Sequence, residues 1–560
     1  MKKACILLFV LFALCMACAE AQYSKYVIRF KDKNGTSYTI NNPSQFLSAR
    51  AIARRSRQHI ALDSTDLPIT PRYIDSVRLS GNVIILNKSK WLNQVCILTT
   101  DPAALARINT FSFVLAEQPV QRPVTINSPS IKFNELISQT NLPLNIQNTL
   151  DYYNYGTSYP QIHFHEGEFL HNLGFRGEGM IMAIIDDGFR NFQNNVAFDS
   201  VRNSNRIIET YDYVDNEVNV NNDDAHGAYC FSIIAANSPG QLVGSCPNAK
   251  YCLYRTEDIF TESPVEEQNW VVAAERADSL GADILSTSLG YTTFDNPTLN
   301  HTYADLNGKT TIIAKGNALA TKKGIISVVA AGNEGNGSWH FISTPADADN
   351  IIDVAAVNTS GMVAGFSSYG PSSDGRVKPT VASIGLGTAL VDSYGNTSRG
   401  NGTSFAAPNL AGLVSCLWQA FQDFTNLEII EAVKRSSSTY TTPDNRIGYG
   451  IPNFHIAYDD LAKQRLIRSI TTILGTDWLK VYPNPFHSTF TLVINPQRTA
   501  NANFSLYDAD GKLYLNKSVA LQQGVGQFLK FNNVQPMAKG IYTLKFNDGT
   551  INRSIKLMVQ

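Results

Sequence analysis

The sequence predicts an α/β protein in which a parallel sheet is flanked by helices, preceded by a small α+β domain and followed by a small all-β sandwich. Four apolar runs alternate with helical patterns, which is typical of parallel strands buried on both faces. These runs span 180–185, 282–285, 324–330 and 351–357. Residues 478–560 instead show short alternating strands with hairpin signals at 508–511 and 547–550, which indicates an antiparallel sandwich.

Length and charge narrow the class of protein. A chain of 560 residues is longer than one hydrophobic core usually organises, so we expect about two to four domains. The composition, with 44% hydrophobic and 17% charged residues, is that of a globular protein. The formal net charge of -1 gives no reason to expect nucleic acid or an anionic membrane as a partner. Polypeptides and small molecules remain the expected substrates.

The first 21 residues have the pattern of a signal peptide. Lys2 and Lys3 precede an uncharged, mostly apolar stretch over 4–19, and a small-residue cleavage signal ends at Ala21. No later run of about 18 apolar residues follows, so we expect no transmembrane segment and an exported protein. A lipoprotein acylated at Cys18 is the weaker alternative, because such signals carry an aliphatic residue three positions earlier.

Five cysteines follow the signal peptide, and an exported chain can join them in disulfides. The sequence does not choose among the pairings. Cys416 falls in an apolar helical pattern, where a cysteine behaves as a small hydrophobic residue. The five are Cys96, Cys230, Cys246, Cys252 and Cys416.

Residues 22–120 mix strand and helix patterns and form the predicted α+β domain. The expected strands are 26–30, 91–98 and 111–115, and the expected helices are 46–60, 73–79 and 102–108. The first helix carries arginines at positions 50, 54, 55 and 57. We interpret them as a solvated face without a function.

The remaining boundaries follow from changes in composition. Residues 121–149 are rich in Pro, Asn, Gln and Ser, as expected of a linker and processing region. The α/β domain is expected over 150–463, and 464–477 would link it to the C-terminal sandwich.

Two candidate catalytic side chains stand at the ends of predicted elements. Asp186 directly follows the strand 180–185, at the edge where open parallel sheets place their sites. His226 opens an apolar helix and is followed by Gly227, which lets another backbone approach. Each also has an ordinary explanation, because acids often end strands and an isolated histidine is more often structural.

Ser404 and Asn333 are further candidates. Ser404 lies among small residues before a helix expected over 410–418, whose N-terminus favours negative charge. A serine at this place is equally a helix cap. Asn333 ends a buried strand in a glycine turn and can donate to an oxyanion, as can the Ser404 backbone N–H. Singly each pattern is ordinary, but together the four indicate a hydrolytic triad in the order Asp, His, Ser.

These motifs resemble those of the subtilase family of serine proteases. The resemblance covers roughly 156–454 and includes Ser288-Leu289-Gly290. It implies a subtilisin-like fold for the α/β domain. It also implies that Ser288, Leu289 and Gly290 line the substrate, which would pair with this segment as an added strand.

The resemblance implies a serine endopeptidase that forms an acyl-enzyme. Ser404 would attack the peptide carbonyl, His226 would take its proton and Asp186 would orient the imidazole. Asn333 would stabilise the oxyanion. Two departures from the family pattern are Tyr229, where histidine is common, and Phe405, where methionine is frequent.

The flanking domains also resemble known families. The N-terminal domain resembles the propeptide of Bacteroidetes subtilases, which implies an intramolecular chaperone and inhibitor; a retained ordinary domain is the alternative. Residues 481–486 and 539–544 resemble the C-terminal sorting domain of the type IX secretion system. That resemblance implies the type IX machinery as a partner and a secreted or cell-surface protein. A carbohydrate- or substrate-binding module is the alternative.

Two other functions stay open. One is a catalytically silent surface or adhesion protein on a protease fold, and the other is a maturation protease that cuts a single partner. We expect no cofactor and no catalytic metal. Structural calcium is compatible with the family, but no loop has convincing ligand spacing, and Asp223 and Asp224 are as easily solvated loop acids.

Overall fold

The computed structural model describes residues 23–122, 150–221, 224–532 and 537–560. The expected signal peptide, Asp223 and nearly all of the expected linker 121–149 lie outside these residues. The chain forms two compact units, Met1–Ala457 and Tyr458–Gln560.

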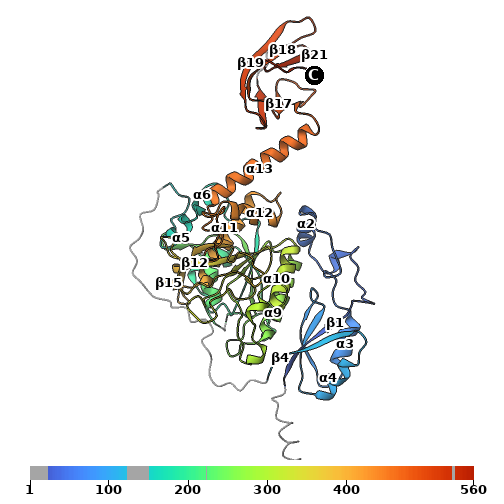
Figure 1. Cartoon of the computed structure of the whole chain (residues 1–560), viewed down its shortest axis with the longest axis vertical. Helices are drawn as coiled ribbons and strands as arrows, with labels where there is room; N and C mark the ends of the chain where they lie inside the picture. Colours follow the sequence, from blue (N-terminus) through green and yellow to red (C-terminus); the bar gives the residue numbers. More distant parts are fainter. Residues whose placement is uncertain (1–22, 123–149, 222–223, 533–536) are drawn as a thin grey trace, which may run out of the picture. The chain divides into compact units, whose positions relative to one another are not determined.

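The first unit begins with the predicted α+β domain (blue in Figure 1). Its four strands form an antiparallel sheet in the order β2-β3-β1-β4. The sequence patterns missed strand β2, because its exposed and half-buried residues do not alternate cleanly. The elements are β1 (Lys25–Phe30), η1 (Pro43–Gln45), α2 (Ala49–Arg57), α3 (Pro71–Arg78), β2 (Ile84–Ser89), β3 (Gln94–Leu98), α4 (Pro102–Asn109) and β4 (Val114–Gln121).

A seven-stranded sheet forms the centre of the first unit, in the order β13-β12-β11-β10-β5-β9-β6. All neighbouring pairs are parallel, which confirms the predicted fold class. The four predicted strands occupy consecutive positions in the sheet. The strands are β5 (Ile181–Asp186), β6 (Ile207–Asp212), β9 (Lys250–Arg255), β10 (Ile284–Thr287), β11 (Ile326–Ala330), β12 (Ile352–Val357) and β13 (Val381–Ile384).

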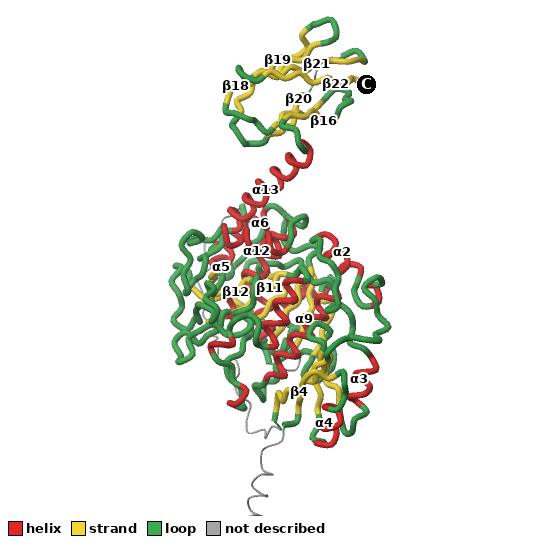
Figure 2. The backbone as a smooth tube through the Cα atoms, turned by 45° about the vertical axis from the view of Figure 1, so that its right-hand side comes forward, coloured by secondary structure: helices red, strands yellow, loops and turns green. Residues whose placement is uncertain are grey.

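Helices cover both faces of this sheet (Figures 1 and 2). Helices α9 (Pro264–Leu280) and α10 (Ile312–Lys322) pack together on one face, where they bury alternate residues of β5. Helices α8 (His226–Ala235) and α11 (Thr403–Ala420) pack together and against the strands on the other. The strands are therefore buried on both faces, which explains their continuous apolar sequence.

Shorter elements complete the first unit. They are α5 (Tyr159–His163), α6 (Gly167–Asn172), η2 (Val196–Phe198), α7 (Asp199–Asn203), β7 (Asn237–Ser238), β8 (Leu242–Val243), η3 (Pro297–Leu299), η4 (Tyr303–Asp305), β14 (Leu386–Val391), β15 (Thr397–Asn401) and α12 (Asn426–Arg435).

The interpretation of the arginine-rich helix as a solvated face is wrong. Arg54 and Arg55 of α2 are 1% and 2% exposed, and both guanidinium groups contact the carboxylate of Asp278 in α9. Only Arg50 and Arg57 retain substantial exposure, at 37% and 33% of their side chains. The partner of the buried arginines lies more than two hundred positions away in the sequence, so local pattern carried no sign of it.

The expected linker 464–477 is also different, because helix α13 (Phe454–Leu474) continues through most of it. Ile470 and Leu474 recur at helical spacing and pack with Val493 of the C-terminal sandwich. Their burial favours a helix over an extended connection.

The second unit contains the predicted β-sandwich, with a three-stranded sheet β16-β17-β20 and a four-stranded sheet β19-β18-β21-β22. Both are antiparallel, and the two predicted hairpin turns join β18 to β19 and β21 to β22. The strands are β16 (Leu479–Tyr482), β17 (Phe490–Ile494), β18 (Ala500–Tyr507), β19 (Leu513–Leu521), β20 (Gln527–Phe531), β21 (Gly540–Asn547) and β22 (Asn552–Val559).

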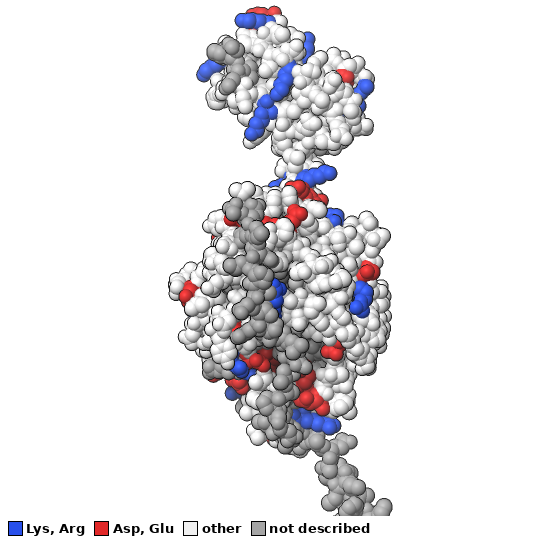
Figure 3. Space-filling view, turned by 90° about the vertical axis from the view of Figure 1, so that its left-hand side faces the viewer, with Lys and Arg blue, Asp and Glu red and all other residues white. Residues whose placement is uncertain are grey.

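Three global features concern function. All five cysteines within the described ranges are buried with free thiols. Of the helices in the described part of the chain, none is long and apolar enough to cross a membrane. On the described surface in the view of Figure 3, charged side chains lie singly or in small groups among uncharged ones.

Candidate active site

Three candidate residues lie at one edge of the parallel sheet, where neighbouring strands end. Asp186 is the last residue of β5, Ser288 directly follows β10, and Asn333 is the third residue after β11. These strands are adjacent in the order β11-β10-β5. Because all run in the same direction, their carboxyl ends bring the three side chains to one site, as in other open parallel sheets.

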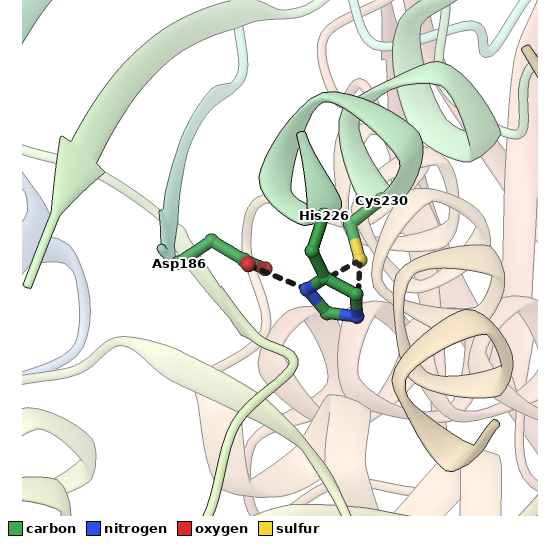
Figure 4. Close-up of side chains that lie close together, drawn as sticks. All are labelled: Asp186, His226 and Cys230. Atoms are coloured by element: carbon green, nitrogen blue, oxygen red, sulfur yellow. Dashed lines mark hydrogen bonds and ion pairs between the residues drawn. The ribbon is translucent and has the colours of Figure 1, made fainter. Parts of the chain in front are cut away.

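Asp186 and His226 contact each other directly. Nδ1 of His226 lies 2.6 Å from Oδ1 of Asp186, and both side chains are buried (Figure 4). With the carboxylate ionised, Nδ1 carries the hydrogen, which leaves Nε2 to accept a proton. Gly227 allows this approach, because a Cβ atom there would lie 2.8 Å from Cβ of Asp186 and 2.4 Å from the Gly188 carbonyl oxygen.

A second buried carboxylate, Asp187, adjoins this pair. Its Oδ1 accepts the backbone N–H of Gly227 at 3.1 Å, which ties the start of α8 to the end of β5. Burial, together with the charge of Asp186, raises the pKa of the Asp187 carboxyl well above its usual value of 3.8. Asp187 therefore positions α8, the helix that begins with His226. Within the described part of the chain, the carboxylate that contacts the imidazole is that of Asp186.

Cys230 lies one helical turn after His226 and faces the same imidazole (Figure 4). Its Sγ is 3.9 Å from each ring nitrogen of His226. Burial raises the pKa of the Cys230 thiol to about 12, so the sulfur stays protonated. The Cys230 side chain therefore packs against the imidazole of His226 and is unsuited to act as a nucleophile.

Ser404 is the second residue of α11, so the helix begins earlier than the 410–418 that the sequence predicts. Pro408 lies inside the helix, and its missing N–H would otherwise bond to the Ser404 carbonyl. That carbonyl instead accepts hydrogen bonds from Ser288 Oγ at 2.8 Å and Cys230 Sγ at 3.4 Å. A side chain directly after β10 and one from α8 thus hold the backbone of Ser404.

Asn333 is oriented by Thr403, the residue before Ser404. The backbone N–H and the Oγ1 hydroxyl of Thr403 both donate to Oδ1 of Asn333, each at 2.9 Å. Because a backbone N–H can only donate, the carboxamide oxygen must point to Thr403. The Asn333 NH₂ group is then the part of this side chain that can donate to a ligand.

A cavity of about 120 Å³ adjoins Ser404 and Asn333. Ser288, Leu289 and Gly290, the segment predicted to line the substrate, form part of its wall. Ser288 directs its hydroxyl to Ser404, so its side chain supports the serine as well as the wall.

The two departures from the family pattern have visible contacts. Phe405 packs on the imidazole of His226, with ring centroids 5.6 Å apart. The hydroxyl of Tyr229 accepts a hydrogen bond from Ser393 Oγ at 3.3 Å.

Two groups of described side chains have ligand atoms within 4.8 Å, close enough for a metal ion: Asp186 with His226 and Cys230, and Glu257 with Glu262 and Glu266. The first group is a poor ligand set because its thiol stays protonated. In the second, both carboxylate oxygens of Glu266 already accept backbone N–H groups. We assign no metal to either group.

Sequence reasoning missed Asp187, Cys230 and Thr403. Cys230 had a usable signal, because residues four apart on a helix share a face and His226 was already a candidate. Thr403 had none, since its role depends on a loop seventy positions earlier in the chain.

Three family models match the chain. The subtilase family matches residues 177–450, the Bacteroidota peptidase S8 propeptide domain matches 25–135, and the secretion system C-terminal sorting domain matches 480–560. The central domain is therefore a subtilase domain, and the chain is a subtilisin-like serine peptidase with a propeptide domain. The sorting domain marks it for type IX secretion to the exterior or the cell surface.

Two subtilisins are similar to the central part of this chain. Subtilisin NAT of Bacillus subtilis subsp. natto is 29% identical over 297 residues, which cover 51% of this chain and 68% of that protein. Subtilisin of Bacillus pumilus is 29% identical over 297 residues, covering 51% and 94%. Among solved structures, MycP1 from Mycobacterium smegmatis has a TM-score of 0.43 at 20% identity, covering 61% of this chain and 90% of that one.

Proposed function

We propose that the chain is an endopeptidase in which Asp186, His226 and Ser404 form the catalytic triad and Asn333 stabilises the oxyanion. The observation that carries this proposal is the 2.6 Å contact between Asp186 and His226 at the same sheet edge as Asn333 and its neighbour Thr403. Ser404 at the start of α11 and Asn333 line one cavity at this edge.

Each residue has one chemical task. Oγ of Ser404 attacks the scissile carbonyl carbon while Nε2 of His226 takes the hydroxyl proton. Collapse of the tetrahedral intermediate breaks the C–N bond, and His226 gives the proton to the leaving amine. Water then repeats the sequence on the acyl-enzyme and regenerates Ser404. Asp186 keeps the proton on Nδ1 and stabilises the imidazolium that forms in both halves.

The oxyanion would be held by the Asn333 NH₂ group and the backbone N–H of Ser404. The N-terminus of α11 adds its partial positive charge at the same place. Loss of one such donor has cost a subtilisin about 10² to 10³ in rate, which is the size we expect for Asn333.

The substrate class is polypeptide. The chain segment Ser288-Leu289-Gly290 extends from β10 along the cavity wall, where an extended peptide can add as a further strand. The triad and the oxyanion donors supply every step of the reaction, so we propose that the chemistry needs no cofactor. A chelator should leave the initial rate unchanged.

We further propose the division of the chain given by its sequence. Residues 22–120 would assist folding and inhibit the enzyme, 150–463 would form the catalytic domain, and 478–560 would direct secretion. The expected processing region is 121–149.

A fluorophosphonate probe tests the proposal. The full chain from residue 22, a Ser404→Ala variant and a Ser360→Ala control, which changes an exposed serine, would be labelled in parallel. We expect labelling of the parent and the Ser360→Ala control, but not of Ser404→Ala, and cleavage of a mixed peptide library by the same two proteins. A folded, propeptide-free parent that is neither labelled nor active would favour the silent surface protein instead. Cleavage of a single peptide would favour the dedicated maturation protease.

A further inference from the structure

A segment of the propeptide domain contacts the catalytic domain far from the candidate active site. Residues 48–66, here called the anchor segment, include α2 and lie against the end of α9 and the end of α10 (Figure 1). Ser48 Oγ donates to the Leu280 carbonyl at 2.9 Å, and Gln58 Nε2 donates to the Gly324 carbonyl at 2.8 Å. The anchor segment therefore binds the loops that precede β10 and β11.

Five buried charges form the centre of this contact. Arg54 and Arg55 both bind the carboxylate of Asp278. Arg55 also donates to Asp66 at 2.7 Å, and Lys323 of the catalytic domain donates to Asp66 at 2.8 Å. Charges of opposite sign thus alternate across the boundary between the two domains.

The charged groups of this contact are almost completely buried, so each one depends on its partner. Arg54, Asp278 and Asp66 are at most 1% exposed. Burial raises the pKa of the Asp278 carboxyl, but the charges of Arg54 and Arg55 outweigh it and hold this pKa below its usual value. Removing one partner of a buried ion pair strongly destabilises the contact, because the remaining charge is buried without a partner of opposite sign.

Two glycines of the catalytic domain let the anchor segment approach. Gly281, at the end of α9, has φ +94°, and a Cβ atom there would lie 2.9 Å from the Ala51 backbone nitrogen. Gly324 has φ +89°, and its Cβ would lie 2.7 Å from Ile60. Both surfaces are shaped for this contact.

The propeptide sheet makes a separate contact with the middle of α9 (Figure 2). There Asn87 donates to Asn269 at 2.7 Å and Gln94 donates to Gln268 at 2.7 Å. The anchor contact is distinct from this one in place and in chemistry. It is also remote from the candidate triad, because it lies at the amino ends of β10 and β11 and the catalytic residues lie at the carboxyl ends.

We propose that the anchor segment is a second attachment site, which keeps the propeptide domain bound after the chain between the two domains has been cut and sets how long it stays. The inhibitory meaning of this attachment rests on the proposed function, but the attachment itself does not. Cleavage of the connecting chain alone then leaves the propeptide domain bound. The domain dissociates only when the contacts of Arg54 and Arg55 with Asp278 break.

The experiment uses the full chain with Ser404→Ala, so that catalysis plays no part. A recognition sequence for an added site-specific protease is placed within 123–149, the protein is cut, and release of the N-terminal fragment is followed by size-exclusion chromatography. The parent is compared with Arg54→Ala. Arg78→Ala is the matched control, because Arg78 is 57% exposed and pairs with Asp75 inside its own helix.

We expect the fragment of the parent and of Arg78→Ala to stay bound, and release from Arg54→Ala to be faster by about 10²-fold or more. Release from the parent should change little between low and high salt, since buried charges are weakly screened. Release of the parent fragment at the Arg54→Ala rate would overturn the proposal. If Arg54→Ala does not fold, Asp278→Asn and Arg50→Ala decide by the same comparison.

Discussion

The backbone carbonyl of Ser404 lies one helical turn before Pro408, the one residue type that has no N–H to donate to it. Ser288 Oγ fills that place at 2.8 Å, with the weaker thiol donor of Cys230 at 3.4 Å. The position of the candidate nucleophile therefore depends on a hydroxyl directly after β10, in the segment that also lines the cavity beside Ser404.

The roles of Ser288 and Pro408 should be coupled. In the Ser404→Ala protein, Ser288→Ala should lower the free energy of unfolding by about 1 kcal/mol, since a buried carbonyl loses its main donor. With Pro408→Ala also present, the substituted residue supplies a backbone N–H, and the cost of Ser288→Ala should fall to less than half. Urea unfolding of the four proteins measures the coupling. Equal costs in both backgrounds would show that the helix does not supply the missing donor.

Asp187 should make the fold less stable as the pH rises. Its carboxyl is buried near Asp186, His226 and Asp224, and its pKa is raised well above 3.8. A carboxyl with a raised folded-state pKa is favourable only while protonated, so the penalty grows above the unfolded pKa and is complete above the folded one. Asp187→Asn keeps an oxygen for the Gly227 N–H and cannot ionise.

We therefore expect Asp187→Asn to raise the urea midpoint of the Ser404→Ala protein more at pH 8 than at pH 4. Glu217→Gln, which changes an exposed carboxylate outside this group, is the control for a general loss of negative charge. A stabilisation that is the same at both pH values would argue against ionisation of Asp187 in the folded protein.

The sequence could predict the sheet and its edge because that information is local. An uninterrupted apolar run identifies a strand buried on both faces, and Asp186 and Asn333 follow such runs closely. Parallel strands then bring residues from distant parts of the chain to one edge without any knowledge of their contacts.

Other features needed the folded chain. Arg54 and Arg55 have the sequence pattern of an exposed helix face, and the carboxylates of Asp278 and Asp66 make their burial tolerable. The sequence predicts the start of α11 too late, because a proline such as Pro408 is typical of the first turn of a helix. In the structure its missing hydrogen bond is replaced by Ser288.

Thr403 should control the rate through Asn333. Thr403→Val removes the hydroxyl that donates to Asn333 Oδ1 and accepts the Gly332 N–H at 3.1 Å, but it keeps the backbone N–H donor and the side-chain volume. Loss of the hydrogen bond to Asn333, about 1 kcal/mol, predicts a fall in kcat of roughly five-fold with KM little changed, and loss of the bond from Gly332 should lower the free energy of unfolding as well. Thr403→Ser should restore kcat, because it restores the hydroxyl. A rise in KM at constant kcat would place Thr403 in substrate binding instead.

Glu275 makes the sheet contact of the propeptide domain sensitive to pH. This carboxylate of α9 accepts hydrogen bonds from Ser89 Oγ and from the backbone N–H groups of Lys90 and Trp91. Burial raises its pKa to about 7, although the charge of Lys90 acts in the opposite direction. Lys33 is a further charged group that interacts with Glu275, and Asp278, Arg55 and Asp66 interact with Lys90.

Release of the cut propeptide domain should accordingly accelerate as the pH rises. Glu275 holds its proton more tightly when the propeptide domain covers it than after release, when water reaches the carboxyl. Binding is therefore strongest below the usual pKa of 4.5 and weakens as the pH rises to about 7. The full shift corresponds to roughly 10²-fold in affinity. Size-exclusion chromatography of the cut Ser404→Ala protein between pH 5 and 8 measures this, and Glu275→Gln should abolish the dependence. The NH₂ group of the glutamine replaces one of the two oxygens that accept the backbone N–H groups of Lys90 and Trp91, so we expect weaker binding of this variant at every pH. If Glu275→Gln shows the same pH dependence as the parent, another group titrates and Glu275 does not govern the release.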